Sequence, residues 1–297
     1  MIRCLLVGLI FIISINTVSA QPATNVVVSI RPIHSIVSAL MEGVSEPRLL
    51  LDSNESAHTF HLKPSQLKLL SNADLIITIG DSFESGLSKV IRNIDQNYRL
   101  NLSEIKELQI YDFRDHNEVE HDEHNEHDKD LHLWLDVGNV QIIAEKIKQR
   151  LIEINPSNKE KYNTNYLELK SKLNQLEEKI QFQLEPIKST PFAIYADILQ
   201  YFEKNFALNK PVIIAPYHGA RLSINRVIKA KNKMKNQKTR CLIYGSENTS
   251  KQINVLTEGL DIKAHSVDIL GVKLEPGSEQ YFDLMKEISN QLASCLE

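Results

Sequence analysis

Short apolar segments alternate with amphipathic ones over the first third of the chain, and this alternation limits the possible folds more than any other feature. Strands are expected at 26–30, 48–51 and 74–79. Helices are expected to begin at Pro32 and Pro64, because the missing N–H of proline would have no partner in the first turn. Strands that alternate with helices favour a parallel sheet covered by helices. Ligands of such sheets bind in loops at the carboxyl ends of the strands.

The last third of the chain repeats this alternation. Strands are expected at 192–196, 211–215, 241–245 and 264–270, and helices at 220–235, 249–260 and 278–296. A chain of 297 residues is long enough for two domains of ordinary size.

Between these regions the sequence predicts one unusually long helix, 155–186. Asn155 is a capping residue, Pro156 fits the first turn and Pro186 ends the helix. Its apolar residues recur every three or four positions: Tyr162, Tyr166, Leu169, Leu173, Leu176, Ile180 and Leu184. About 30 residues at about 1.5 Å each span roughly 45 Å. A coiled-coil dimer is the alternative, but the flanking strand patterns favour a brace packed across two lobes.

The amino terminus has the features of a secretory signal peptide, which we predict at residues 1–20. Arg3 precedes an apolar run, 5–15, and the small residues Val18-Ser19-Ala20 precede Gln21. The run is too short for a dependable membrane span. We therefore expect an exported, soluble mature protein in the periplasm.

The three cysteines fit this expectation. Removal of the signal peptide removes Cys4, which lies too far from the cleavage point to carry a lipid anchor, and leaves Cys241 and Cys295. In an oxidising compartment such a pair is expected to form a disulfide that ties the final segment to a strand. Two free buried thiols are the alternative.

A polar tract from residue 112 to 130 is rich in acids and histidines. Its histidines are His116, His121, His124 and His127. The tract cannot bury enough apolar surface to offset its ordering entropy, so a loop that is disordered without metal is expected. Imidazoles and carboxylates together suit divalent ions, zinc above all. A solvated acidic loop is the alternative.

The tract then changes into an alternating apolar segment, 131–136, which contains His132. An ordered segment can hold a histidine in a fixed geometry. The sequence therefore predicts a loose metal-collecting loop that leads into a structured metal site.

Composition and motifs argue against other functions. The formal net charge is −4, and there is no basic region that would attract nucleic acid. The chain has no His-Glu-x-x-His and no Gly-x-Ser-x-Gly motif. An enzyme, including a zinc hydrolase, is therefore not expected.

A series of short motifs, in this order and spacing, resembles one family. The motifs are Ser29-Ile30-Arg31-Pro32 with His34-Ser35, Ala57-His58-Thr59-Phe60, Lys63-Pro64-Ser65, Asn72-Ala73-Asp74-Leu75, Leu131-His132-Leu133-Trp134-Leu135-Asp136, Tyr201-Phe202-Glu203, Gly219-Ala220-Arg221-Leu222, Asp268-Ile269-Leu270-Gly271 and Ala293-Ser294-Cys295-Leu296. The chain resembles the zinc-binding solute-binding proteins of ATP-binding-cassette (ABC) importers, the ZnuA-like group. The resemblance implies an α/β protein with two Rossmann-like lobes joined by one long helix, and a metal cleft between the lobes. It also implies a monomer that captures zinc and delivers it to a permease in the inner membrane, without catalysis.

On this resemblance the chain divides into three parts after the signal peptide. Residues 21–154 are expected to form the N-terminal lobe with the histidine-rich acidic loop, 155–186 the connecting helix, and 187–297 the C-terminal lobe.

The resemblance also implies metal ligands. His58 and His132 match histidines that bind metal in the family. A third family histidine, from the second lobe, is replaced here by Ala196, and Ala57 stands where an acidic residue can precede the first histidine. An alanine methyl group cannot donate to a metal, whereas zinc takes about four donors. Other groups must therefore complete the coordination.

Asp268 is the expected donor from the second lobe, because it matches a carboxylate ligand of manganese-binding relatives. Auxiliary donors are His61, Asp197 and His218, with water or a loop histidine as further sources. The expected cargo is zinc, ahead of manganese. The alternative functions are a periplasmic metal buffer or chaperone with a degenerate site, and a manganese-preferring relative.

Overall fold

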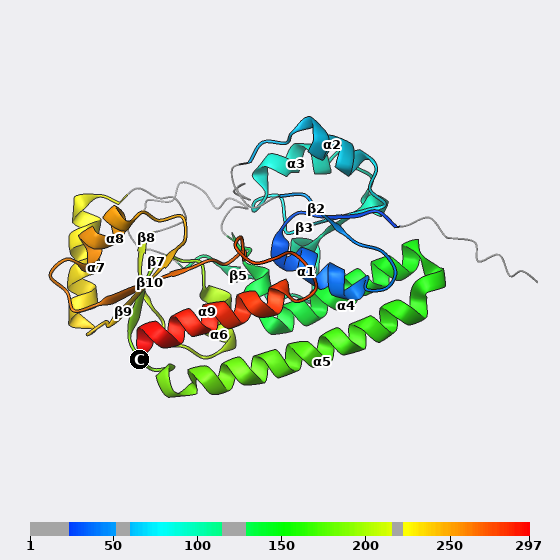
Figure 1. Cartoon of the computed structure of the whole chain (residues 1–297). Coiled ribbons are helices and arrows are strands. Elements are labelled where there is room, and N and C mark those ends of the chain that lie inside the picture. The colour runs from blue at the N-terminus through cyan, green and yellow to red at the C-terminus, as the bar shows by residue number, and fades with distance from the viewer. Residues whose placement is uncertain (1–23, 52–59, 115–128, 216–221) are drawn as a thin grey trace, which may run out of the picture.

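The structure is a computed structural model that describes residues 24–51, 60–114, 129–215 and 222–297. Two four-stranded parallel sheets, each flanked by helices, lie towards opposite ends of a long helix, α5 (Lys159–Leu184) (Figure 1). This confirms the predicted α/β fold of two Rossmann-like lobes joined by one helix.

The first sheet has the strand order β2-β1-β3-β4. Its strands are β1 (Val26–Val28), β2 (Arg48–Leu49), β3 (Leu75–Thr78) and β4 (Arg99–Asn101). The helices of this half are α1 (Arg31–Leu40), α2 (Pro64–Ser71), α3 (Ser85–Ile91) and α4 (Val137–Ile154). The two central strands, β1 and β3, are buried along their whole length, which explains their unbroken apolar sequence.

The second sheet has the order β10-β9-β7-β8 and is also parallel. Its strands are β7 (Phe192–Ala196), β8 (Val212–Ala215), β9 (Cys241–Gly245) and β10 (Lys263–Val267). The helices of this half are α6 (Gln200–Asn205), α7 (Ile224–Asn236), α8 (Ser250–Thr257) and α9 (Gln280–Leu296). The strand predicted at 264–270 ends early, at Val267, because the Asp268 carboxylate accepts hydrogen bonds from the next turn. Helix α7 likewise begins at Ile224, where Ser223 caps it, and not at residue 220.

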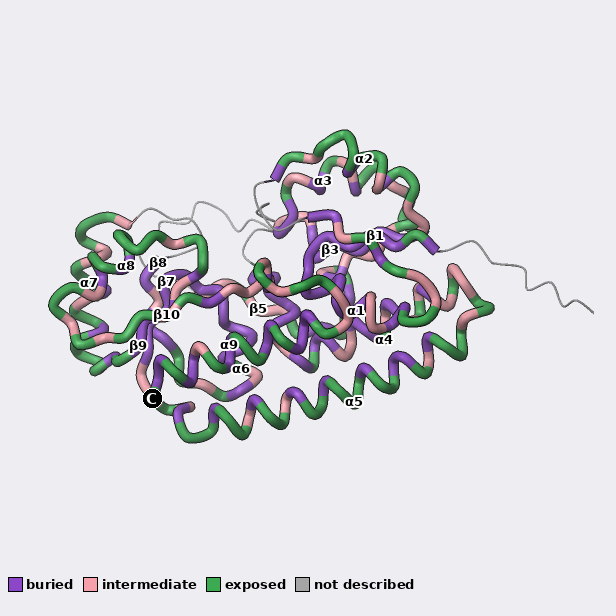
Figure 2. Tube along the Cα trace, viewed as in Figure 1, coloured by how far each residue is buried: buried purple, intermediate pink, exposed green. Residues whose placement is uncertain are grey.

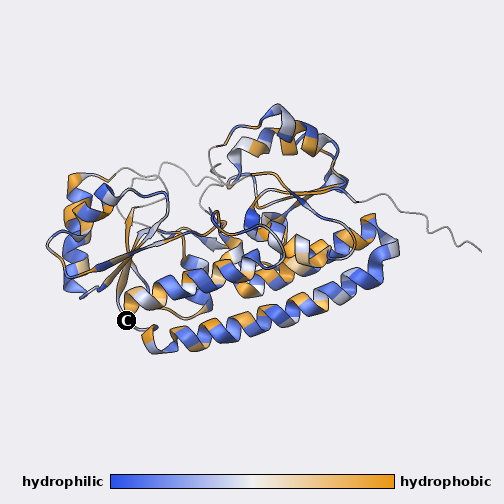
Figure 3. Cartoon of the chain, viewed as in Figure 1, coloured by the Kyte–Doolittle hydropathy of each residue, from blue (hydrophilic) through white to orange (hydrophobic). Residues whose placement is uncertain are grey.

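Helix α5 packs across both halves of the chain, as predicted. Its apolar stripe is buried, and the helix packs against α1, α4 and α9 of the same chain (Figure 2). The stripe is thus used inside the monomer, which disfavours a coiled-coil dimer. Pro156 belongs to a separate 3-10 turn (Pro156–Asn158) that follows Asn155, so the helix starts at Lys159. Both sheets are mostly hydrophobic in Figure 3, whereas α5 is mostly hydrophilic.

The predicted disulfide is present. Cys241, at the start of β9, is bonded to Cys295, near the end of α9, with an S–S distance of 2.08 Å and a Cα–Cα distance of 5.4 Å. The bond joins the last helix to the second sheet. Across the described ranges, no helix is long and apolar enough to cross a membrane.

The two lobes meet around a short 3-10 turn, Leu133–Leu135. Trp134 Nε1 donates a 2.8 Å hydrogen bond to the carbonyl of Ile269, just after β10. The carbonyl of Trp134 accepts a 2.9 Å bond from the hydroxyl of Tyr281 on α9. All three side chains of the turn are fully buried. This turn therefore ties the first half of the chain to the second, directly beside His132.

Candidate metal site at the lobe junction

His132 is held in a buried aromatic and apolar environment, with 3% of its surface exposed. It follows β6 (Lys129–Asp130) and begins the 3-10 turn, so the predicted alternating segment is a turn with every side chain buried from Leu131 to Leu135. The rings of Phe83 and Trp134 meet the imidazole edge-on, at centroid distances of 5.7 and 5.5 Å. These contacts fix the plane of the ring.

Asp130 orients this imidazole. Its Oδ1 lies 2.7 Å from His132 Nδ1 and also accepts a 3.1 Å bond from the His132 backbone N–H. Asp130 is 0% exposed. A carboxylate at Nδ1 selects the tautomer with the proton on that atom, so Nε2 is the nitrogen with metal-donor character. The Asp130–His132 pair is the arrangement commonly found behind a metal-binding histidine.

Asp130 is the last residue of the histidine-rich tract 112–130. The prediction that this tract is a loop is wrong at both of its ends. The tract's ends are not loop: β5 (Tyr111–Asp112) pairs with β6 as an antiparallel hairpin, Tyr111 with Asp130 and Asp112 with Lys129. The ends are ordered because their backbones pair and Asp130 has buried partners. His116, His121, His124 and His127 lie outside the described residues. Their metal-capturing role stays a prediction.

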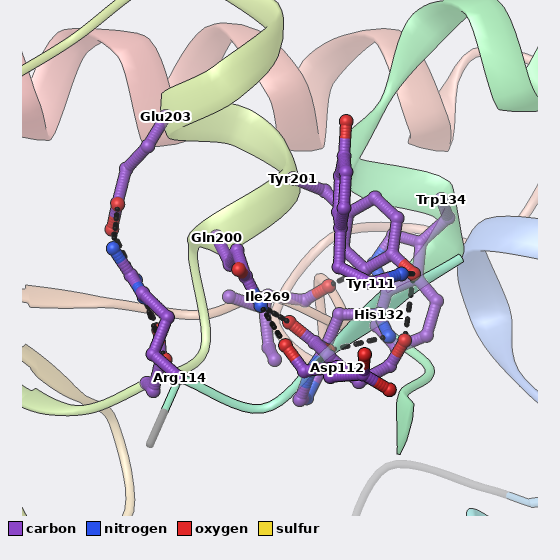
Figure 4. Close-up of polar contacts among 11 residues, drawn as sticks. Tyr111, Asp112, Arg114, His132, Trp134, Gln200, Tyr201, Glu203 and Ile269 are labelled. Carbon is purple, nitrogen blue, oxygen red and sulfur yellow. Dashed lines mark hydrogen bonds and ion pairs between the residues drawn. The ribbon is translucent and has the colours of Figure 1, made fainter. Parts of the chain in front are cut away.

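The hairpin is docked on α6 of the second half of the chain (Figure 4). The Tyr201 hydroxyl donates a 2.6 Å bond to the Asp130 carbonyl and accepts a 3.2 Å bond from the Tyr111 N–H. Gln200 Nε2 donates to the Asp112 carbonyl at 3.0 Å and to Asp130 Oδ2 at 3.2 Å. The base of the tract therefore rests on the second lobe.

A buried ion cluster adds to this docking. Arg114, just beyond β5, donates to both oxygens of Asp197 and to both oxygens of Glu203 (Figure 4). Both acid side chains are nearly inaccessible, at 1% and 4% exposure. Burial raises the pKa of Glu203 to about 7, and Arg114 opposes this shift. Asp197, one of the predicted auxiliary donors, is thus bound to a guanidinium in this structure.

Asp268, the predicted donor of the second lobe, organises its own loop. Its Oδ1 accepts 2.9 Å bonds from the N–H groups of Leu270 and Gly271, and its Oδ2 accepts a 2.6 Å bond from Val272. A carboxylate has about four acceptor positions. Three of these are occupied, so Asp268 retains room for one further bond and suits one-oxygen coordination only.

The other predicted positions divide into two groups. Ala196 is the buried last residue of β7, and His61 is exposed just before α2. His58 and His218 lie outside the described residues. Within the described residues, no three His, Cys, Asp or Glu side chains gather as a metal site. The described part of the molecule therefore supplies one oriented histidine rather than a complete ligand set.

Two further described histidines have local partners. His34 Nε2 lies 3.1 Å from the carbonyl of Pro47, and burial lowers its pKa. His265 Nδ1 lies 3.1 Å from the Gln291 side-chain oxygen. Both contacts are within single lobes.

Sequence reasoning missed the residues that support His132, namely Asp130, Gln200 and Tyr201. Only Asp130 carried a local signal, because it lies two residues before the histidine. The other two come from a distant part of the chain.

Two helix-covered parallel sheets joined by one long helix, with an oriented histidine where they meet, define a metal solute-binding protein. The chain belongs to the ZnuA family, described as "Zinc-uptake complex component A periplasmic", which matches residues 26–295. This is a family of periplasmic solute-binding proteins and not of enzymes, as the sequence predicted.

The sequence of a relative agrees with this assignment, and solved structures share the fold. The chain is 30% identical over 304 residues to the high-affinity zinc uptake system protein ZnuA of Brucella abortus (strain 2308), with 91% of each chain covered. The fold is similar to that of a zinc-bound ZnuA deletion mutant, with a TM-score of 0.77, 19% identity and coverage of 93% of this chain and 99% of that one. It is also similar to a manganese-bound mutant of the periplasmic metal binding protein of Candidatus Liberibacter asiaticus, with a TM-score of 0.75, 19% identity and coverage of 92% and 100%.

Proposed function

We propose that this protein is exported to the periplasm, where, as a monomer, it binds zinc and delivers it to the permease of an ABC importer. One observation carries the proposal: His132 is buried at the lobe junction with its Nδ1 held by the buried Asp130 carboxylate. This arrangement selects the tautomer with Nε2 as the donor atom and fixes its direction, as metal-binding histidines require.

His132 and His58 are the proposed nitrogen donors, because both match metal-binding histidines of the family that the sequence resembles. Asp268 is the proposed oxygen donor of the second lobe, through its remaining acceptor position. Its three backbone bonds make it a weaker donor than a carboxylate with no such bonds. Water completes the coordination, which zinc tolerates in sites with fewer than four protein ligands.

The zinc preference rests on the high-affinity zinc uptake proteins among the relatives. A manganese-bound structure of similar fold and the alanine at position 196 favour a second candidate, a manganese-preferring protein. A harder, oxygen-rich ligand set suits manganese better than two imidazoles do. Relative affinity alone does not decide between them, because a given protein site generally binds zinc more tightly than manganese. Growth rescue decides: the proposal expects this chain to restore growth in zinc-poor medium and not in manganese-poor medium, and the reverse result contradicts it.

Delivery is a separate claim from binding. A buffer or chaperone would bind zinc equally well without supporting uptake. A strain that lacks its own zinc-binding protein but retains the permease is expected to regain growth in zinc-poor medium when this chain is expressed. The His132→Ala variant is the matched control. Tight zinc binding without rescue would favour the buffer function.

A further inference from the structure

We propose that Gln200 acts as a positioning residue for His132 through Asp130, so that the affinity for metal depends on the contact between the two lobes. This proposal rests on the proposed function, since it takes His132 as a metal ligand. Gln200 lies on α6 of the second half of the chain, 70 residues from Asp130.

One oxygen of the Asp130 carboxylate contacts the first lobe, and the other contacts the second lobe. Its Oδ1 faces His132, at 2.7 Å from Nδ1, and its Oδ2 accepts from Gln200 Nε2 at 3.2 Å (Figure 4). Asp130 is 0% exposed, and Gln200 is 2% exposed. Bulk water therefore cannot replace either bond. A rotation of the carboxylate about its own axis would break both bonds at once.

The orientation of the Gln200 amide follows from its partners. Both groups near Nε2 are acceptors: the Asp112 carbonyl at 3.0 Å and Asp130 Oδ2 at 3.2 Å. The two N–H groups of a primary amide match two acceptors, whereas the opposite orientation would place the amide oxygen against a carbonyl and a carboxylate. The NH₂ group must therefore face Asp130, which keeps the carboxylate an acceptor on both sides.

Tyr201 supports the same carboxylate from the backbone. Its hydroxyl donates to the Asp130 carbonyl at 2.6 Å and is 0% exposed with the rest of the residue. The side chain of Asp130 is thus held by Gln200 and its main chain by the next residue of α6. The bond series from Gln200 through Asp130 to His132 joins the second lobe to the proposed donor atom.

The consequence is a coupling between lobe contact and metal binding. Partners behind a metal-binding histidine fix its tautomer and raise its donor strength, and their loss costs about 10- to 100-fold in affinity. Gln200 is one bond further from the metal than Asp130. We therefore expect its loss to cost about tenfold, at the lower end of this range.

The test compares Gln200→Leu, which removes the donor at similar size, with wild type. The first readout needs no metal: ¹⁵N chemical shifts of the His132 ring, recorded at about pH 8, above the ordinary pKa of free histidine. Wild type is expected to show the tautomer protonated on Nδ1, and Gln200→Leu a mixture of tautomers. The second readout is the zinc Kd from chelator competition, expected to rise about tenfold.

Lys204→Met is the matched control, because Lys204 lies on the same helix and its Nζ sits 3.4 Å from the ring centroid of Tyr111 in the same hairpin. It is expected to leave the His132 tautomer and the zinc Kd unchanged. Gln200→Asn, which is one methylene shorter, is a milder second variant if Gln200→Leu fails to fold.

The outcomes separate the claims. An unchanged tautomer and Kd in Gln200→Leu, or a wild-type ring protonated on Nε2, would overturn the positioning role. A tautomer that also shifts in Lys204→Met would show that Gln200 acts only by holding the hairpin in place, and this result would also overturn the positioning role. A wild-type protein that shows the expected tautomer but binds no zinc would refute the proposed function alone.

Discussion

The polar side chains on the two sides of the lobe junction have different kinds of hydrogen-bond partners. On the first-lobe side, His132 is held by a carboxylate that leaves Nε2 as the donor atom. On the second-lobe side, Asp197 binds Arg114, and Asp268 binds three backbone N–H groups. The methyl side chain of Ala196 offers no donor atom. The first-lobe side presents a ligand, whereas the carboxylates of the second-lobe side are largely occupied by donors of the protein itself, with one acceptor position left on Asp268. We infer that the first lobe dominates the affinity for metal.

The largest expected effect follows from removing the oriented histidine. His132→Ala is expected to weaken zinc binding by more than about 100-fold, because even the loss of a supporting partner costs about 10- to 100-fold. Chelator competition measures the change. The control is His265→Ala, whose imidazole contacts Gln291 within the second lobe. Equal zinc affinity in His132→Ala and wild type would contradict the inference that the first lobe dominates the affinity for metal.

Asp130→Asn tests the support of that histidine. The amide keeps the shape of the side chain but removes its charge, so the zinc Kd is expected to rise about 10- to 100-fold. Asp112→Asn, in the same hairpin, is the control, because that carboxylate is 69% exposed and pairs with Lys129. A Kd that changes equally in both variants would show that charge in the hairpin, and not the bond to Nδ1, matters.

Ala196→His tests the second-lobe side of the junction, where the side chain of residue 196 has no donor atom. A new imidazole at the end of β7 restores the donor type that the family places there, and the zinc Kd is expected to fall about tenfold, equivalent to about 1.4 kcal/mol. Ala196→Leu controls for the added bulk, because its side chain has no donor atom. If neither variant changes the Kd, position 196 does not face the metal.

The ion cluster of Arg114, Asp197 and Glu203 is expected to affect the pH dependence of stability. The pKa of Glu203 is raised to about 7 in the folded protein, from 4.5, chiefly by burial. Between about pH 4.5 and 7 the unfolded chain has released this proton while the folded protein retains it. The free energy of unfolding therefore loses up to about 1.4 kcal/mol per pH unit from this group as the pH rises through the window.

Glu203→Gln is expected to remove this contribution, so its unfolding free energy changes less between about pH 5 and 7 than that of wild type. Urea denaturation at both pH values measures the difference. Glu275→Gln, at an exposed position, is the control. Parallel pH profiles for Glu203→Gln and wild type would show that Glu203 is ionised throughout.

Most strands and most helices could be predicted because local patterns determine them, whereas β4, β5, β6, α3, α4 and α6 were not predicted. The disulfide could be predicted because two cysteines remain once the signal peptide is removed. Unbroken apolar runs gave β1 and β3, helical spacing gave α5, and an even pair of cysteines gave the bond between Cys241 and Cys295. The errors occurred where a side chain overrides the local pattern. Asp268 ends β10 early, and burial on all sides makes a turn of the segment around His132.

The supporting groups of the site could not be predicted in the same way. Gln200 and Asp130 are 70 residues apart, and Arg114 and Asp197 are 83 apart. Periodicity and composition describe neighbours in sequence, so they cannot pair such residues. The auxiliary role predicted for Asp197 illustrates the difficulty, because its guanidinium partner becomes visible only in three dimensions.

Anomalous diffraction from zinc-loaded crystals tests the proposed role of His132 most directly. We expect a zinc ion about 2.0–2.1 Å from His132 Nε2, with the Asp130 carboxylate still on Nδ1 and the nearest second-lobe donor a single Asp268 oxygen or a water. Zinc bound only by histidines of the 112–130 tract, with His132 uncoordinated, would contradict it.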